Sequence, residues 1–327
     1  MNAPNSPEYG PNERLRVALE LTNACNFRCP ICPHSLGKAG AVNGALPGMS
    51  PFNRTRGLMS SATYDRALDE CNRVASHVEL GFFGEQTMHP EYLDFLGRAK
   101  ERRFALELNT NLSLVTDATF DAWVDVDLDL ARLSLDAFDP DVFDRARPGN
   151  VRDLDGRPIG DRRRVEVLNE KVERWLARKD HRPTRLVFVK SSHNEGELER
   201  FVEHWAPLLG ADDVILAKQV LSYGGKMADP TIAKHRCNVW EQRYLMIDWR
   251  GDLSPCNLDT NMDLGLGNVL RESIHEAYTG AIANHLRART GCGNDLTPCR
   301  TCVDGNDWSK NETFTRDTTL EGAANAR

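Results

Sequence analysis

Three cysteines near the start of the chain have the spacing of a metal site. Cys25, Cys29 and Cys32 form the pattern C-x3-C-x2-C. They follow an apolar run, Arg16 to Thr22, that is typical of a strand. Thiolates are soft ligands that select iron-sulfur clusters or zinc, and three of them can hold three corners of a cubane. The fourth iron would then lack a protein ligand and could bind another molecule. The alternative is a zinc site completed by His34.

A second group of cysteines lies in the last third of the chain. Cys237 and Cys256 stand in the arrangement C-x13-G-x4-C, and Cys299 with Cys302 forms a C-x2-C pair. The intervening stretch 244–253 indicates a hairpin, which would bring Cys237 and Cys256 together at its open end. A structural zinc ribbon with four cysteine ligands is the alternative here.

Two further cysteines complete the nine in the chain. Cys71 lies on the apolar face of a predicted helix and is expected to be a buried small hydrophobe. Cys292 stands between two glycines, and three roles are open for it: a cluster ligand, an inert surface thiol or a donor of a hydrogen atom.

Composition places the chain among ordinary globular proteins. Its 327 residues are 40% hydrophobic and 27% charged, and the formal net charge of -7 argues against a nucleic-acid-binding surface. The first fourteen residues lack the apolar core of a secretory signal, and no apolar run approaches the length of a membrane helix. We therefore expect a cytoplasmic protein with no membrane and no nucleic-acid partner, in which cysteines serve metal binding or catalysis.

The elements that must position the first cysteines alternate between short apolar runs and segments with helical periodicity. This pattern predicts parallel β/α units, and six strands suffice for an open barrel. The predicted helices include Ser61 to Ala75, Pro90 to Arg102, Thr116 to Val124 and Gly196 to Leu209, and a later helical stretch runs from Ser273 to Arg289. The predicted strands are Arg16 to Leu21, His77 to Phe83, Ala105 to Asn109, Leu130 to Asp136, Thr184 to Lys190 and Asp213 to Ala217.

Two long loops interrupt this alternation. Leu36 to Gly57 is rich in Gly, Pro, Asn and Ser and follows the first cysteines directly, so it is either a lid over the site or a surface excursion. Arg145 to Arg164 follows the fourth predicted strand, and its arginines either meet a substrate anion or cover a solvated crossover.

The triplet after a first strand resembles the radical S-adenosylmethionine (radical SAM) superfamily. In that family the open iron chelates S-adenosylmethionine, and one electron cleaves it to methionine and a 5'-deoxyadenosyl radical that abstracts a substrate hydrogen. The resemblance implies a 4Fe-4S cluster on the triplet and an external reductant such as flavodoxin or ferredoxin. The residue before the last cysteine is usually aromatic in the family; here it is Ile31, which could still pack on the adenine.

The resemblance also implies binding residues for S-adenosylmethionine at the ends of the barrel strands. Gly84 and Glu85 resemble the family's Gly-Gly-Glu element, in which the glycine permits close approach and the carboxylate receives the amino group. Turn and cap chemistry would explain the other polar residues nearly as well. These candidates are Asn109, Asn111, Ser134 and Asp136. Beyond them, Lys190 and Gln219 could point into the barrel, where a lysine with a lowered pKa serves as a base or binds an anion; the alternative is a surface lysine.

The second cysteine group resembles the auxiliary-cluster domain called SPASM in its short form, Twitch. This resemblance implies a second, auxiliary 4Fe-4S cluster held by Cys237, Cys256, Cys299 and Cys302. The predicted fold is thus an α/β protein, a partial (β/α)6 TIM-like barrel followed by a Twitch domain. We expect a tail at 1–14, the barrel at 15–225, the Twitch domain at 226–305 and a second tail at 306–327.

Family members of this length with one auxiliary cluster act on carbohydrates, aminocyclitols and nucleosides in antibiotic biosynthesis. The resemblance therefore implies hydrogen abstraction from a hydroxyl-bearing ring carbon of a small molecule, with dehydrogenation, epimerisation or decarboxylation as outcomes. A second hypothesis is modification of a ribosomal peptide; it is disfavoured because few residues precede the first strand. A third is a zinc-binding scaffold that is not an enzyme.

Overall fold

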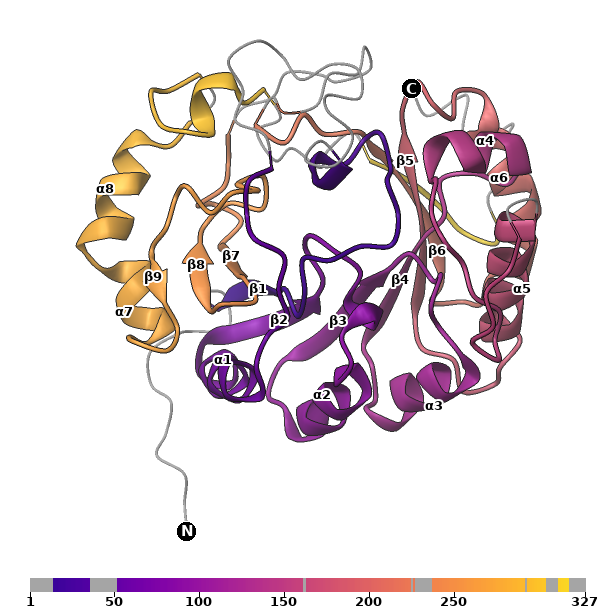
Figure 1. The fold of residues 1–327 in the computed structure, drawn as a ribbon, viewed down its shortest axis with the longest axis horizontal. Helices are drawn as coiled ribbons and strands as arrows, with labels where there is room; N and C mark the ends of the chain where they lie inside the picture. Colours follow the sequence, from indigo (N-terminus) through magenta and orange to yellow (C-terminus); the bar gives the residue numbers. More distant parts are fainter. Residues whose placement is uncertain are drawn as a thin grey trace.

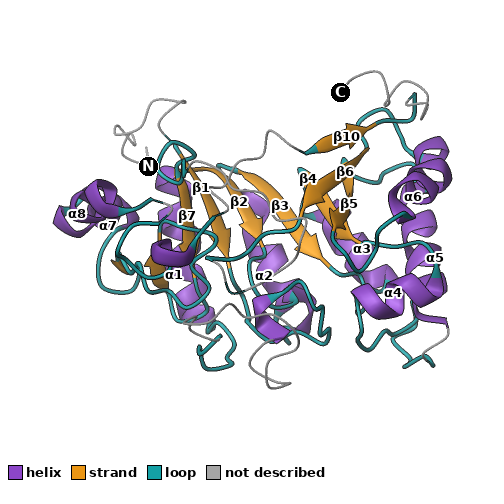
Figure 2. Ribbon diagram, turned by 90° about the horizontal axis from the view of Figure 1, so that it is seen from above, coloured by secondary structure: helices purple, strands orange, loops and turns teal. Residues whose placement is uncertain are grey.

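A curved parallel sheet forms the frame of the molecule, as Figures 1 and 2 show. The computed structural model describes residues 14–35, 52–160, 163–224, 226, 237–291, 293–303 and 311–317. Six strands lie side by side in chain order and are parallel to one another. This is the partial β/α barrel that the sequence predicted. The strands are β1 (Leu15–Leu19), β2 (Ala75–Leu80), β3 (Ala105–Thr110), β4 (Leu130–Ser134), β5 (Thr184–Lys190) and β6 (Val214–Gln219).

Helices lie along the outer side of the curved sheet (Figures 1 and 2). The first begins where predicted, because the Ser60 side chain accepts a hydrogen bond from the backbone of Thr63. Cys71 lies on its buried face and is fully covered, as expected. The helices α4 and α5 were not predicted; they flank the loop expected at 145–164. The bounds are α1 (Ser61–Val74), α2 (Tyr92–Arg98), α3 (Asp117–Asp125), α4 (Pro140–Ala146), α5 (Arg164–Leu176) and α6 (Glu197–Trp205), with short 3-10 turns at Pro33–Ser35, Gln86–Met88, Ala99–Glu101, Ala206–Leu208 and Cys299–Thr301.

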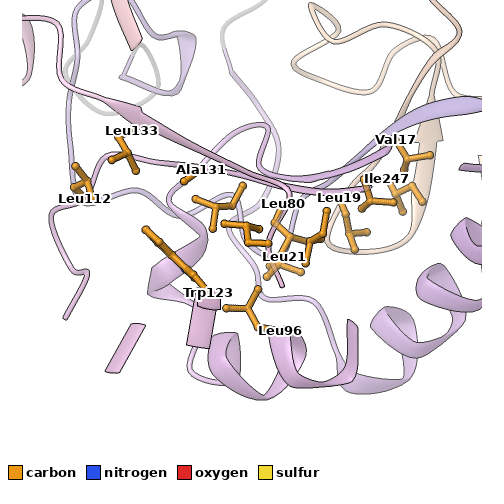
Figure 3. Packing of buried hydrophobic residues seen from close by; sticks show 14 of the residues in the cluster. Val17, Leu19, Leu21, Leu80, Leu96, Leu112, Trp123, Ala131, Leu133 and Ile247 are labelled. Atoms are coloured by element: carbon orange, nitrogen blue, oxygen red, sulfur yellow. The ribbon is translucent and has the colours of Figure 1, made fainter. Parts of the chain in front are cut away.

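The core lies between the sheet and these helices. Successive residues of a strand point to opposite faces of the sheet, so every second side chain is directed toward the helices. Figure 3 shows Leu19, Leu80 and Leu133 on this face, with Leu96 and Trp123 packed below them. Each of the five side chains is at most 1% exposed, and burial of such residues is the main force that holds helices to the sheet.

The opposite, inner face of the barrel is polar. Arg132 of β4 donates to Glu79 of β2 at 2.6 Å and to Glu107 of β3. Tyr244, which begins the strand on the other side of β1, donates its hydroxyl to the same Glu79 at 3.5 Å. These groups come from four strands of the sheet, so the barrel presents a hydrogen-bonding interior rather than an apolar one.

The C-terminal region extends this sheet at both edges. Strand β7 (Tyr244–Ile247) is parallel to β1 and forms the predicted hairpin with the antiparallel β8 (Asp252–Ser254), followed by β9 (Gly267–Asn268). The predicted helical stretch is present as α7 (Ile274–Thr279) and α8 (Ala281–Arg289), which meet at Gly280. At the other edge, β10 (Glu312–Phe314) pairs antiparallel with β6. The sequence analysis gave no strand there.

Within the described residues, the helices are all too short or too polar to cross a bilayer. Part of the predicted lid, residues 36–51, and the predicted N-terminal tail up to residue 13 lie outside the described residues, as does Cys292.

Candidate active site

The first three cysteines lie on the loop that leaves the carboxyl end of β1. The loop is held by its own backbone, since Cys32 donates to the carbonyl of Cys29 at 3.1 Å. The side chain of Ser35 donates to the same carbonyl at 2.8 Å. The ring of His34 is buried, and its Nε2 lies 2.9 Å from the carbonyl oxygen of Asn23. This contact engages His34 with the backbone, which does not favour its role as a fourth zinc ligand.

Gly84 allows the end of β2 to approach this loop. Its φ is +90°, and a Cβ at this position would lie 2.3 Å from the carbonyl oxygen of Thr22. The next amide, that of Glu85, donates to the carbonyl of Ala24 at 2.7 Å. Glycine is required here for both its backbone conformation and its lack of a side chain. The segment thereby fixes the residue that directly precedes Cys25.

Glu85 lies under the loop with its carboxylate buried. It accepts hydrogen bonds from the Thr110 hydroxyl and from the Asn111 backbone, both at 2.7 Å. These bonds tie the end of β3 to the cysteine loop. The predicted contact of Glu85 with an ammonium group stays a prediction. Its charge already acts on the site, because burial first and Glu85 second raise the pKa of Cys25.

The polar residues predicted at the strand ends come together around this loop. The side-chain nitrogen of Asn111 lies 3.9 Å from Sγ of Cys25 and 3.2 Å from Oδ1 of Asn26. Ser134 of β4 donates to Asn109 of β3 at 3.2 Å. These contacts join the ends of β3 and β4 to each other and the end of β3 to the cysteine loop. Ile31 lies half-buried within the loop itself.

Asp136 is paired with an arginine that the sequence analysis did not single out. Arg147 donates from Nε to Oδ2 of Asp136 at 2.7 Å, and both side chains are buried. Asp136 also accepts from the amide of Val189 at 2.7 Å, which links β4 to β5. The signal for Arg147 was the arginine-rich loop at 145–164, but nothing in its composition distinguished this arginine from its neighbours.

The loop after α4 lies directly against the cysteine loop. The amide of Arg28 donates to the carbonyl of Pro148 at 2.7 Å, and Phe27 forms a β-bridge with Gly149. A Cβ on Gly149 would lie 2.0 Å from the Phe27 ring. This close fit carries Arg147 to the cysteines, where its charge partly offsets the effect of burial on Cys29.

Burial disfavours the thiolate form of all three cysteines. It raises the pKa of Cys29 to about 12 and raises those of Cys25 and Cys32 as well. Thiolates in such surroundings need a nearby positive charge, which bound metal ions supply when they displace the thiol protons. The chemistry of this donor set therefore fits a metal cluster.

The four cysteines of the second group line one pocket at the open end of the β7–β8 hairpin. Cys237 precedes β7, Cys256 follows β8, and Cys299 and Cys302 flank a short 3-10 turn. The rest of the wall is largely apolar, with Val239, Leu258 and Leu264. The predicted approach of Cys237 and Cys256 is thus confirmed, and burial raises the pKa of Cys256 well above its ordinary value.

Neither cysteine set has the compact arrangement of a single-ion site. In the part of the chain that the structure describes, no three His, Cys, Asp or Glu side chains are grouped to hold one metal ion. A cubane needs a wider spacing, because its irons and sulfides stand between the cysteine ligands. The two sets fit iron-sulfur clusters on the chemistry of their donors.

The lysine predicted inside the barrel is not Lys190. Its ammonium group pairs with Glu312 of β10. Glu312 lies opposite Ala217, a residue of the helix-facing side of β6. Strand alternation turns Lys190 and Gln219 to this outer side and turns Lys218 inward. Of the two alternatives for Lys190, the structure therefore supports the surface lysine and not the lysine inside the barrel.

Comparisons with known proteins agree with this arrangement. The family model described as the radical SAM superfamily matches residues 19–174, and the SPASM model, described as an iron-sulfur cluster-binding domain, matches residues 237–303. Together the two models cover more than half of the chain. The chain therefore belongs to the radical SAM superfamily, and its C-terminal region is a SPASM domain. These assignments imply a 4Fe-4S cluster with S-adenosylmethionine in the barrel and auxiliary iron-sulfur binding in the C-terminal domain.

Curated relatives align with only part of the chain. PqqA peptide cyclase of Ruegeria pomeroyi is 27% identical over 204 residues, which are 61% of this chain and 47% of that protein. The tungsten-containing aldehyde ferredoxin oxidoreductase cofactor-modifying protein of Pyrococcus furiosus is 28% identical over 120 residues, 36% of this chain and 30% of that protein. The chain thus spans less than half the length of either relative.

Solved structures share the fold at low sequence identity. BtrN in complex with AdoMet and 2-DOIA gives a TM-score of 0.51 at 14% identity, covering 90% of this chain and 92% of that one. SuiB of Streptococcus suis bound to the precursor peptide SuiA gives a TM-score of 0.63 at 11% identity, covering 90% and 70%. At these identities the likeness shows the fold alone.

Proposed function

We propose that this protein abstracts a hydrogen atom from a hydroxyl-bearing ring carbon of a sugar, aminocyclitol or nucleoside. The observation that carries the proposal is the polar inner face of the barrel, where Glu79, Glu107 and Arg132 offer acceptors and donors. Such a lining suits a substrate rich in hydroxyl groups, since buried polar groups need hydrogen-bond partners. BtrN, with which the chain shares its fold over 92% of that chain, was solved with 2-DOIA and AdoMet.

Each part of the site has a proposed task. Cys25, Cys29 and Cys32 would hold the first cluster and leave one iron open. When bound, this cluster and S-adenosylmethionine would supply a 5'-deoxyadenosyl radical, which is the group that takes the substrate hydrogen. The residues proposed to bind and orient S-adenosylmethionine are Ile31, Gly84, Glu85, Asn109, Asn111, Ser134 and Asp136.

The fate of the substrate radical sets the product. Loss of one electron to an auxiliary cluster held by Cys237, Cys256, Cys299 and Cys302, with loss of the hydroxyl proton, would give a ketone. Return of a hydrogen atom from a thiol, for which Cys292 is the candidate, would give an epimer. Loss of a neighbouring carboxylate as carbon dioxide, followed by uptake of a proton at the vacated carbon and of a hydrogen atom from a thiol at the radical carbon, would give decarboxylation.

Deuterium transfer tests the proposal. The reconstituted protein is incubated anaerobically with reductant, S-adenosylmethionine and ring-deuterated glycosides, aminocyclitols or nucleosides. Deuterium in 5'-deoxyadenosine is the expected result. Its absence with every ring substrate, when S-adenosylmethionine is still cleaved, would contradict the carbohydrate assignment and leave the family assignment in place.

Peptide modification is the second candidate. It is favoured by the similarity to PqqA peptide cyclase and by the fold shared with SuiB bound to SuiA. Deuterium transfer from a peptide labelled at its side chains, with none from the ring compounds, would select this alternative.

A further inference from the structure

Lys218 is the one inward-facing lysine near the carboxyl end of β6. Its register partner on β5 is Val189, whose amide donates to Asp136 at 2.7 Å. Asp136 in turn pairs with Arg147, whose charge acts on Cys29. Two hydrogen bonds and one strand pairing therefore connect Arg147, whose charge reaches the cysteine loop, through Asp136 and Val189 to the position of Lys218. The carboxyl ends of barrel strands are where such folds bind ligands.

The cations around Lys218 differ from it in their partners. Arg132 pairs with Glu79 and with Glu107. Arg147 pairs with Asp136. Within the described residues, the structure gives the ammonium group of Lys218 neither a hydrogen bond nor an ion pair. Among the described residues, Lys218 is thus a cation without a partner, whereas Arg132 and Arg147 each pair with a carboxylate.

An unpaired ammonium group in this position is unfavourable. Burial is the main cause that lowers the pKa of Lys218, and Arg132 and Arg147 act in the same direction. Glu79 and Asp136 oppose them, but each carboxylate already serves an arginine. Lys218 keeps part of its surface exposed. A charged side chain that loses part of its hydration without gaining a partner reduces stability, so its retention inside a ligand-binding barrel points to a role with a ligand.

We propose that the ammonium group of Lys218 binds an anionic group of the substrate, a carboxylate or a phosphate. The pairing would be a charge-assisted hydrogen bond inside the barrel, of the kind that water weakens little. The inference rests on the proposed function, because that function supplies the ring to which the anionic group is attached. It narrows the proposed substrates to ring compounds that carry an acidic group. The neutral hydroxyls of the ring would meet the Glu79, Glu107 and Arg132 side chains.

Matched ligands test the inference by calorimetry on the reconstituted protein with S-adenosylmethionine bound. The probes are methyl glucuronide, which carries a carboxylate, glucose 6-phosphate, which carries a phosphate, and neutral methyl glucoside. We expect one of the two anions to bind at least about tenfold more tightly than methyl glucoside. Whichever anion binds more tightly identifies the group. Equal binding of all three would overturn the inference while leaving the carbohydrate proposal standing.

Substitutions assign the preference to one residue. Lys218→Met should abolish it, whereas Lys218→Arg should keep most of it because the charge is retained. Lys179→Met, which removes an exposed lysine between α5 and β5, is the control for loss of one positive charge. Retained binding of S-adenosylmethionine shows that each variant is folded. A preference that survives in Lys218→Met would overturn the inference.

If none of the three sugars binds, the carbohydrate proposal is contradicted. Inorganic phosphate then decides the role of Lys218 on its own. Phosphate that binds the original protein at least about fivefold more tightly than Lys218→Met supports an anion site, and equal or undetectable binding overturns it.

Discussion

Arg147 donates from Nε to Oδ2 of Asp136 at 2.7 Å, and this buried pair lies beside Cys29. The two residues come from the ends of β4 and α4 and are eleven positions apart. Asp136 adopts a φ of +62°, a left-handed conformation that aspartate tolerates better than most residues. The pair brings a fixed positive charge to the cysteine loop without leaving that charge unpaired.

The first prediction concerns this charge. Arg147→Met should shift the reduction potential of the barrel cluster to more negative values by on the order of 50 mV, because a nearby cation favours the reduced, more negative cluster. The measurement is a redox titration followed by electron paramagnetic resonance. Arg145→Met, which removes an exposed arginine on the same helix, should leave the potential within error. Equal potentials in all three proteins would contradict the placement of Arg147.

Gly84 provides a second prediction. Gly84→Ala should lower the iron bound at the first site and weaken binding of S-adenosylmethionine, because the new Cβ would meet the Thr22 carbonyl oxygen at 2.3 Å. Iron analysis and equilibrium binding report both effects. Gly97→Ala is the matched control, since a Cβ there meets nothing within 4 Å and alanine suits a helix better than glycine. Full iron content in Gly84→Ala would show that the close approach is not needed.

The cysteine assignment predicts a stepwise loss of iron. Reconstituted protein should contain about eight irons and eight sulfides per chain, and Cys256→Ala should contain about four of each. Cys71→Ala is the control, because Cys71 is fully buried in α1 and should leave the iron content unchanged. Zinc without sulfide in the original protein would contradict both cluster assignments.

Much of this site was predictable because its signals are local. The spacing of Cys25, Cys29 and Cys32 lies within one loop, and the strand ends that carry Asn111 and Asp136 follow apolar runs that periodicity detects. The hairpin that brings Cys237 and Cys256 together is likewise a short-range feature. Local patterns of this kind can be read from the sequence because they do not depend on contacts with distant parts of the chain.

The errors concern long-range pairing and the side of a strand. Lys190 and Lys218 are both lysines near the carboxyl end of a strand, and only the strand register with β10 shows which of them faces inward. Strand β10 itself is three residues long, too short for periodicity to detect. Arg147 was hidden in an arginine-rich loop, because its burial depends on Asp136 and on the fit of Gly149 to Phe27.

A buried arginine joins the barrel to the hairpin of the C-terminal domain. Arg54 donates two hydrogen bonds to the Glu20 carboxylate at 2.7 Å each and lies 3.4 Å from Asp248, which follows β7. Arg54→Met should lower the free energy of unfolding by about 3–5 kcal/mol, since it leaves the buried Glu20 carboxylate without its arginine partner. Urea unfolding provides the measurement. Arg98→Met breaks an exposed pair with Asp65 and should cost less than about 1 kcal/mol. Similar losses in the two variants would contradict this difference.

The last prediction concerns a buried lysine that holds the loop after β3. Lys171 of α5 is fully buried and donates to the carbonyls of Leu112 and Ser113 at 3.1 and 3.3 Å. Burial lowers its pKa to about 8, and the charges of Asp153 and Glu85 only partly oppose this. In the unfolded chain the pKa returns to its ordinary value of 10.5. Between these two values the unfolded state binds more protons, so stability rises with pH across this window.

The expected size of this rise is roughly 3 kcal/mol relative to Lys171→Met, in which the titrating group is absent. Urea unfolding at a series of pH values from about 7 to 10.5 measures it, with the difference between the two proteins cancelling other titrations. Lys179→Met removes an exposed lysine of the same region and should follow the pH profile of the original protein. A difference between the original protein and Lys171→Met that stays constant with pH would contradict a lowered pKa of Lys171 in the folded protein.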